Sequence, residues 1–257
     1  MSSKYSQACC SIPPVVSSGY EAKGQYTTLN GMKTYVTGPE TAQNAILIIY
    51  DIFGFFPQTL QGADILSSSD PSRPYRVFMP DFFDGAPADI SWYPPQTDDH
   101  KQQLANFFQT KAAPPSTLSR IPGVVQAANN LAPAGSTAGF KAWAIVGFCW
   151  GGKIASLAAG EGKDPLFKAA VQCHPAMVDA KDAEKVVIPM AVLASKDEDA
   201  EVVEAYKKNL KVASYVETWR GQIHGWMAAR GDLSDPEVKR EYENGYKAVL
   251  GFLHEHM

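Results

Sequence analysis

The sequence is poor in cysteine, and its cysteines lack the spacing that holds metals. Only four of the 257 residues are cysteine, and no two of them stand in the CxxC spacing of a zinc or redox site. Cys9 and Cys10 are adjacent, which is poor geometry for a disulfide between the two. We therefore expect no metal site, and we expect a protein of a reducing compartment.

Strong charge and long apolar runs are also missing. The net charge is −4, and the 23 basic residues are scattered rather than gathered into the patch that a nucleic-acid binder needs. The longest apolar runs, such as residues 45–50, are far shorter than the roughly 20 residues that span a bilayer. The first seven residues lack the apolar region of a signal peptide. These absences predict a cytoplasmic protein that binds neither nucleic acid nor membrane.

Strands and helices alternate along the chain. A hairpin is predicted over residues 26–36, because Asn30-Gly31 suits a type I′ turn. Residues 45–50 and 76–79 are typical of buried strands, and further strands are expected near residues 143, 169, 190 and 214. Helices are expected between them, at residues 60–68, 99–110, 117–131 (with Pro122 near a helix start), 153–160, 200–210 and 235–257. The pattern predicts an α/β protein with a mostly parallel central sheet and helices on both faces.

The 45% of apolar residues is enough for one large core, so we expect a single domain over residues 1–257, with residues 1–24 as an N-terminal extension packed on it. The one long irregular stretch is residues 83–96. Such a loop either shapes a pocket over an active face or packs on its own aromatic residues, and both readings stay open.

The most informative segment is residues 144–152, Ala-Ile-Val-Gly-Phe-Cys-Trp-Gly-Gly. It is typical of a buried strand, a sharp turn and a small-residue helix, which is the nucleophile elbow G-x-Nuc-x-G with Cys149 at its apex. Gly147 and Gly151 stand where a strained turn requires residues without a Cβ. The turn places Cys149 at a helix N-terminus, which favours a thiolate.

A cysteine nucleophile needs a base. Chain order in proteins with this elbow puts the base after the nucleophile, and four histidines follow Cys149. His224 is favoured because it lies in a loop directly after a predicted strand, whereas His254 and His256 belong to the terminal helix. His174 ends a predicted strand on the same face, where it could line a pocket or, against the usual chain order, act as the base.

The base in turn needs an orienting acid. The run Lys196-Asp197-Glu198-Asp199 follows a predicted strand. Asp197 is the first carboxylate past the strand and is preferred as the acid. Asp199 is the alternative, although it would also serve as the N-cap of the helix that begins at Ala200.

Four motifs carry a resemblance to a known family: Tyr-Asp-Ile-Phe-Gly at residues 50–54, Met-Pro-Asp-Phe-Phe at 79–83, Gly-Phe-Cys-Trp-Gly-Gly at 147–152 and His-Gly-Trp at 224–226. The chain resembles the dienelactone hydrolases, a cysteine-nucleophile branch of the α/β-hydrolase fold, and its first residues resemble eukaryotic, particularly fungal, members. The resemblance implies an oxyanion hole made by the backbone N–H groups of Ile52 and Trp150. It places Asp51 where bacterial members carry a glutamate that holds the resting thiol. Alternatively, Asp51 is a carboxylate at the strand end that caps the next helix.

The resemblance also concerns the substrate. Bacterial members bind a substrate carboxylate with two arginines, but residues 82–85 offer none, and the nearest match to the second is Arg230. We therefore expect a small ester or lactone that need not be dienelactone. Candidate substrate contacts are Asp51, Phe53, Tyr93, His174, Trp226 and Arg230.

The sequence therefore predicts a carboxylic ester hydrolase that cleaves a small ester or lactone with Cys149, Asp197 and His224. It should need no cofactor and should be a monomer or homodimer. The alternatives are an esterase or thioesterase for an unrelated substrate, or a non-catalytic binding or redox-sensing protein that uses Cys149 as an oxidisable thiol.

Overall fold

The computed structural model describes residues 19–160, 162 and 165–257, so most of the predicted N-terminal extension, including Cys9 and Cys10, lies outside the described residues. The strands are β1 (Gln25–Leu29), β2 (Met32–Thr37), β3 (Asn44–Ile49), β4 (Tyr75–Pro80), β5 (Ala142–Phe148), β6 (Ala169–Cys173), β7 (Met190–Ser195) and β8 (Ser214–Trp219). The helices are α1 (Pro57–Ser68), α2 (Asp98–Thr110), α3 (Pro114–Asn129), α4 (Trp150–Ala158), α5 (Ala180–Ala183), α6 (Ala200–Asn209) and α7 (Pro236–His256), with a short 3-10 turn η2 (Ile90–Trp92).

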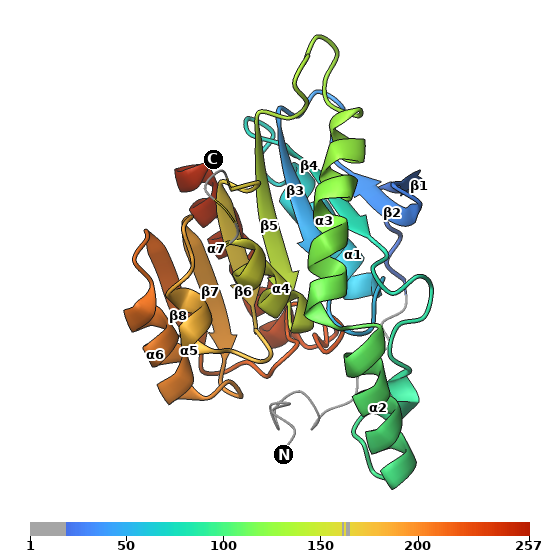
Figure 1. The fold of residues 1–257 in the computed structure, drawn as a ribbon, viewed down its shortest axis with the longest axis vertical. Helices are drawn as coiled ribbons and strands as arrows, with labels where there is room; N and C mark the ends of the chain where they lie inside the picture. The colour runs from blue at the N-terminus through green and yellow to red at the C-terminus, as the bar shows by residue number, and fades with distance from the viewer. Residues whose placement is uncertain (1–18, 161, 163–164) are drawn as a thin grey trace.

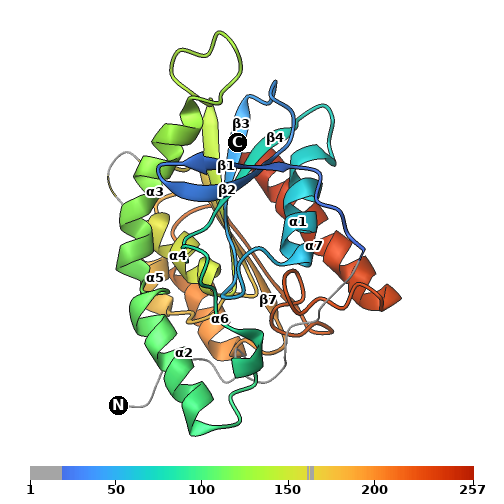
Figure 2. The ribbon, with the colours of Figure 1, turned by 90° about the vertical axis from the view of Figure 1, so that its right-hand side faces the viewer.

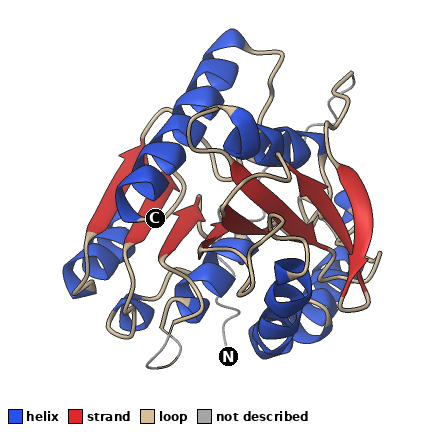
Figure 3. Cartoon of the chain, turned by 90° about the horizontal axis from the view of Figure 1, so that it is seen from above, coloured by secondary structure: helices blue, strands red, loops and turns tan. Residues whose placement is uncertain are grey.

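The strands form one sheet in the order β1-β2-β4-β3-β5-β6-β7-β8 (Figure 1). The pairs β1–β2 and β2–β4 are antiparallel, and the other pairs are parallel. Helices α1 and α7 cover one face of the sheet, while α3, α4, α5 and α6 cover the other (Figure 2). Seen from above, the sheet runs between the two helical layers (Figure 3). The predicted α/β architecture with a mostly parallel sheet is confirmed.

Burial explains the composition of the central strands. The strands β3 and β4 are covered on both faces, so they are apolar almost without a break rather than alternating. The predicted hairpin is present, and Asn30 and Gly31 have φ of 49° and 77°, as a type I′ turn requires. A single cluster of buried apolar side chains extends from Leu29 to Leu253. The sheet and its helical layers therefore share one core.

One predicted boundary is wrong. Pro122 lies inside α3 rather than near its start, and the helix begins eight residues earlier at Pro114. Proline is well suited to the first helical turn, because its missing N–H would have no intrahelical partner there. The pair Pro114-Pro115 carries that signal, and α3 tolerates the later proline within its length.

Residues 20–24 of the predicted extension are attached to the body of the protein. The hydroxyl groups of Tyr20 and Tyr35 donate hydrogen bonds to the two oxygens of Asp64 on α1, over 2.5 and 2.7 Å. The N–H of Lys23 also donates to this carboxylate. Among the residues that the structure describes, no helix is both long enough and apolar enough to cross a membrane.

Candidate active site

The strand β5 ends at Phe148, and α4 begins at Trp150, so Cys149 alone forms the turn between them. Its backbone has φ 53° and ψ −112°, a conformation that L-residues rarely adopt. Two kinds of hydrogen bond hold this strained residue: its N–H donates to the carbonyl of Cys173, and its own carbonyl accepts from Gly152 and Ala176. The predicted turn with Cys149 at its apex is present, and the side chain is largely buried.

The two flanking glycines are required by close backbone contacts. A Cβ on Gly147 would lie 1.9 Å from the carbonyl oxygen of Gly151. A Cβ on Gly151 would lie 2.1 Å from the carbonyl oxygen of Ile49. Because both obstacles are backbone atoms, neither could move without shifting β3 or the start of α4.

The first prediction concerns this turn. Gly151→Ala should lower the free energy of unfolding by more than about 3 kcal/mol, because the new methyl group would overlap the backbone of β3. The matched control is Gly251→Ala, in an exposed position of α7 with no atom near the added Cβ, which should be neutral or stabilise by up to about 1 kcal/mol. Urea denaturation of both variants measures this. Equal stability of the two variants would contradict the assigned turn geometry.

The histidine that the sequence favours lies beside a carboxylate, but the carboxylate is Glu198. The Nδ1 atom of His224 lies 2.7 Å from Oε1 of Glu198, and both side chains are almost fully buried. Glu198 is held in turn by the N–H and the hydroxyl of Ser195 at the end of β7. A buried carboxylate at this distance fixes the tautomer and the orientation of the imidazole ring.

The predictions for Asp197 and Asp199 are corrected accordingly. Asp197 accepts the backbone N–H of His224 over 2.8 Å, so it holds the loop rather than the ring. Asp199 is the N-cap of α6 and accepts the N–H groups of Glu201 and Val202. The sequence favoured Asp197 because it comes first after the strand. Only the path of the turn brings Glu198 to the ring, and no pattern in the run of acidic residues indicates that path.

His174 lies next to this pair. Its ring is 5.3 Å from the ring of His224 and 5.9 Å from that of Phe148, centroid to centroid. It is fully buried, and neither ring nitrogen has a hydrogen-bond partner among the described residues. Burial, followed by the positive charges of His224 and Arg230, holds the pKa of His174 well below its usual value. His174 is therefore a neutral neighbour of the pair, and it links the strand that ends before Cys149 to the ring of His224.

The expected oxyanion donors lie at the ends of β3 and β5. Trp150 is the first residue of α4, so its N–H has no partner within the helix. Its indole donates to the carbonyl of Ala112 over 2.8 Å and is buried. Ile52 accepts from the N–H of Ala88. Within the described chain, neither Ile52 nor Trp150 uses its own backbone N–H in a hydrogen bond.

A family comparison agrees with this geometry. Residues 32–257 match the family model described as "Dienelactone hydrolase family". The chain belongs to the dienelactone hydrolase family. It is 34% identical over 239 residues to an uncharacterized AIM2 family protein of Schizosaccharomyces pombe, covering 91% of each chain. The expected resemblance to fungal members is thereby confirmed.

Relatives of lower sequence identity also match almost the whole chain. The chain is 28% identical over 247 residues to a carboxymethylenebutenolidase homolog of Xenopus tropicalis, covering 93% of each chain. The crystal structure of dienelactone hydrolase from Anabaena variabilis superposes with a TM-score of 0.63 at 13% identity, over 91% of this chain and 99% of that one. That structural likeness establishes the α/β-hydrolase fold of this family member.

Both oxygens of the Asp51 carboxylate accept backbone N–H groups. Oδ1 accepts from Phe53 over 2.9 Å, and Oδ2 accepts from Ala229 over 3.2 Å. Burial raises the pKa of Asp51 to about 6, opposed by these two hydrogen bonds and by the charges of Arg230 and His224. The alternative that the sequence left open, a cap on the next helix, is not found, because the N-cap of α1 is Phe56 and α1 has no side-chain capping hydrogen bond. Asp51 instead holds the turn at the end of β3 through the N–H of Phe53.

The predicted substrate residues separate into two groups. Phe53 and Tyr93 are in edge-to-face contact at 5.3 Å, and the guanidinium of Arg230 lies 5.7 Å from the ring of Tyr93. The loop of residues 83–96 therefore reaches the chain that follows β3 and the chain that follows β8. The loop therefore packs on residues outside itself and not only on its own aromatic residues.

Trp226 belongs to the other group. It is fully buried against Trp219, at 5.5 Å, and against Gly245 of α7, where a Cβ would lie 2.5 Å from the indole. The prediction that Trp226 contacts substrate is corrected, because the turn after His224 directs this side chain into the core under α7. Its spacing from His224 in the sequence could not show this.

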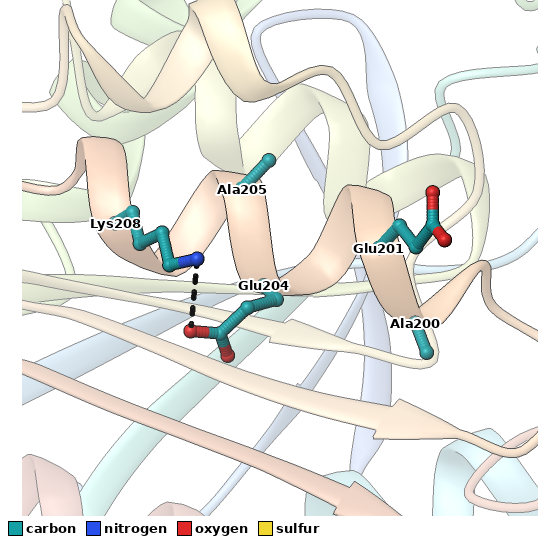
Figure 4. A pocket seen from close by; sticks show the side chains of 5 residues that line it. All are labelled: Ala200, Glu201, Glu204, Ala205 and Lys208. Atoms are coloured by element: carbon teal, nitrogen blue, oxygen red, sulfur yellow. Dashed lines mark ion pairs between the residues drawn. The ribbon is translucent and has the colours of Figure 1, made fainter.

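A hollow on the surface of α6 lies elsewhere in the protein. It is lined by Ala200, Glu201, Glu204, Ala205 and Lys208, all from one helix (Figure 4). Glu204 and Lys208 form an exposed pair at 3.9 Å across one helical turn. An exposed pair of this kind contributes little free energy. The hollow contains none of the residues gathered around Cys149.

Proposed function

We propose that this protein is a hydrolase that cleaves a small ester or lactone through a cysteine nucleophile, Cys149. The observation that carries the proposal is the buried pair of His224 and Glu198 at 2.7 Å, which His174 links to the end of β5, directly before the strained turn at Cys149. A nucleophile, a base and an acid that orients the base are the parts that covalent acyl transfer requires.

The chemistry follows from these positions. Glu198 binds Nδ1 of His224, so Nε2 is the ring nitrogen that accepts the proton of the Cys149 thiol. The thiolate sulfur attacks the substrate carbonyl carbon, and the carbonyl electron pair moves to oxygen. The N–H groups of Ile52 and Trp150 are donors for that oxyanion. When the tetrahedral species collapses, the C–O bond breaks and His224 returns its proton to the leaving oxygen. Water, deprotonated by His224, then cleaves the thioester and restores the thiol.

The substrate is inferred from the residues around the site. Phe53 and Tyr93 offer aromatic contacts, and Arg230 is a buried cation close to Tyr93. Arg230 also lies near enough to Asp51 for its charge to lower the pKa of that carboxyl. Because a carboxylate already faces this cation, we infer a substrate that is neutral rather than anionic.

The second prediction tests this inference. In a panel of γ- and δ-lactones, aryl esters and an anionic dienelactone, neutral substrates should have kcat/KM at least comparable to that of the dienelactone. Arg230→Ala should change the ratio of the two values by less than about threefold, because the charge of Arg230 already faces Asp51 and so selects little between neutral and anionic substrates. The control is Arg220→Ala, an exposed arginine just after β8. A strong preference for the anionic lactone that Arg230→Ala abolishes would contradict the neutral-substrate proposal.

A redox-sensing role for Cys149 is the competing function. A sensor needs an accessible thiol of low pKa, but it does not need a buried carboxylate that orients a neighbouring histidine. The Glu198–His224 pair therefore supports hydrolysis over sensing.

A further inference from the structure

Asp51 joins two loops that are far apart in the sequence. It lies just beyond β3, which ends at Ile49, and is 3% exposed. It accepts one N–H from its own loop and one from Ala229, which lies 178 residues further along the chain. The first loop carries Ile52, and the second carries His224. The two hydrogen bonds of a single carboxylate therefore connect the chain of the expected oxyanion donor to the chain of the base.

A second contact joins the same regions without a charge. The side-chain Nε2 of Gln58, at the start of α1, donates to the carbonyl of Gly231 over 3.0 Å. The two contacts differ in one property: an amide keeps its hydrogen-bonding capacity at every pH, whereas a carboxyl loses an acceptor when it is protonated. Gln58 is thus a matched control for Asp51.

The groups that face Asp51 determine when it is ionised. His224 and Arg230 come from the loop after β8, and Tyr246 comes from α7. Burial keeps the pKa of Tyr246 well above its usual value, so this residue stays neutral. Burial also raises the pKa of Asp51 to about 6, so its carboxylate becomes protonated in mildly acidic solution. The longer of the two hydrogen bonds, from Ala229 at 3.2 Å, is then the one expected to be lost.

We propose that Asp51 is a positioning residue that, in its ionised form, ties the Ile52 loop to the His224 loop. Turnover at Cys149 therefore decreases in mildly acidic solution. The inference rests on the proposed function for its kinetic part only. Asp51 acts on the reaction through the two loops and not through contact with the sulfur. Asn in its place can accept only one of the two N–H groups, because its NH2 faces the other.

Stability and turnover should respond to pH in opposite directions. The pKa of Asp51 is raised above its value in an unfolded chain, so its contribution to stability is fully present below about pH 4 and is lost as the pH rises through about 6. The stability of the wild type relative to Asp51→Asn should therefore increase as the pH falls from 7.5 to 5. Turnover of the wild type should decrease over the same range. A contact that was only structural would change both in the same direction.

The test begins without substrate. Amide hydrogen exchange, corrected for intrinsic rates, should show that Ala229 loses protection by about tenfold between pH 7.5 and pH 5, while Phe53 keeps it. Asp51→Asn should lack Ala229 protection at both pH values, and Gln58→Ala should retain its pH dependence. Protection of Ala229 that is independent of pH or of Asp51 would overturn the proposed tie, whether or not the protein hydrolyses esters.

The kinetic part uses a neutral aryl ester that the wild type turns over. Asp51→Asn should lower kcat by about tenfold at pH 7.5 and should show a smaller decrease toward pH 5 than the wild type, while Gln58→Ala should keep the full wild-type decrease. Alkylation of Cys149 by iodoacetamide should differ by less than about twofold between wild type and Asp51→Asn. Faster alkylation of Asp51→Asn would instead assign Asp51 to holding the thiol, and would overturn the inference.

Discussion

Replacing Cys149 by alanine should lower kcat/KM for an aryl ester by roughly a thousandfold or more, and His224→Ala should do the same. Without the sulfur there is no covalent intermediate. Without the imidazole of His224, the proposed base for the thiol proton is lost. The fold should persist in both variants, because each substitution shortens a side chain while the backbone contacts of the turn remain. Steady-state kinetics and circular dichroism of the same preparations measure the two effects.

The double variant Cys149→Ala/His224→Ala tests whether the two residues act together. If Cys149 and His224 act as a unit, the double variant should be about as impaired as either single variant. The matched thiol control is Cys173→Ala, since this buried cysteine of β6 contributes only its backbone carbonyl to the turn. A double variant whose loss equals the product of the two single losses would show that the residues work independently.

Glu198→Gln is expected to have the second largest effect, lowering kcat by about a hundredfold to ten-thousandfold with little change in KM. Glutamine keeps the size of the side chain, but its NH2 can face Nδ1 of His224 and select the wrong tautomer. Steady-state kinetics of the purified variant measure kcat and KM separately.

The neighbouring acidic residues provide the controls for Glu198→Gln. Asp199→Asn should stay near wild type, because asparagine caps a helix as well as aspartate does. Asp197→Asn should have an intermediate effect, since it weakens a bond to the backbone of His224. A larger loss from Asp197→Asn than from Glu198→Gln would return the orienting role to Asp197.

Local features of the fold could be predicted from the sequence. The strands, most helices and the turn at Cys149 follow from local patterns: apolar runs, an Asn-Gly hairpin, and glycines on both sides of the apex. Each of these features is determined by residues close together in the chain. The structure bears them out because local sterics and burial set them without reference to distant segments.

The carboxylate that contacts the ring of His224 could not be predicted from local patterns. Three acidic residues in succession are alike in composition, and each takes a separate role: Asp197 binds backbone, Glu198 binds the imidazole and Asp199 caps α6. Which one meets the ring depends on how the turn after β7 meets the loop after β8. That relation is tertiary, so no spacing within the run could reveal it.

The same reason applies to Asp51 and Trp226. The role of Asp51 depends on a backbone N–H 178 residues away, and the direction of Trp226 depends on Gly245 of α7. Both residues stood in motifs that pointed to substrate or thiol. The structure shows hydrogen bonds from two loops to Asp51, and it shows Trp226 in the core.

The most direct test of the central claim is to trap the acyl group. The protein is mixed with p-nitrophenyl acetate, quenched in acid within milliseconds to seconds and digested. The masses of its peptides are then measured by mass spectrometry. We expect a burst of nitrophenol approaching one equivalent, with an acetyl group on the peptide that contains Cys149 and no such group in Cys149→Ala. Hydrolysis that continues at the wild-type rate in Cys149→Ala, with the acetyl group on another residue or on none, would contradict the account.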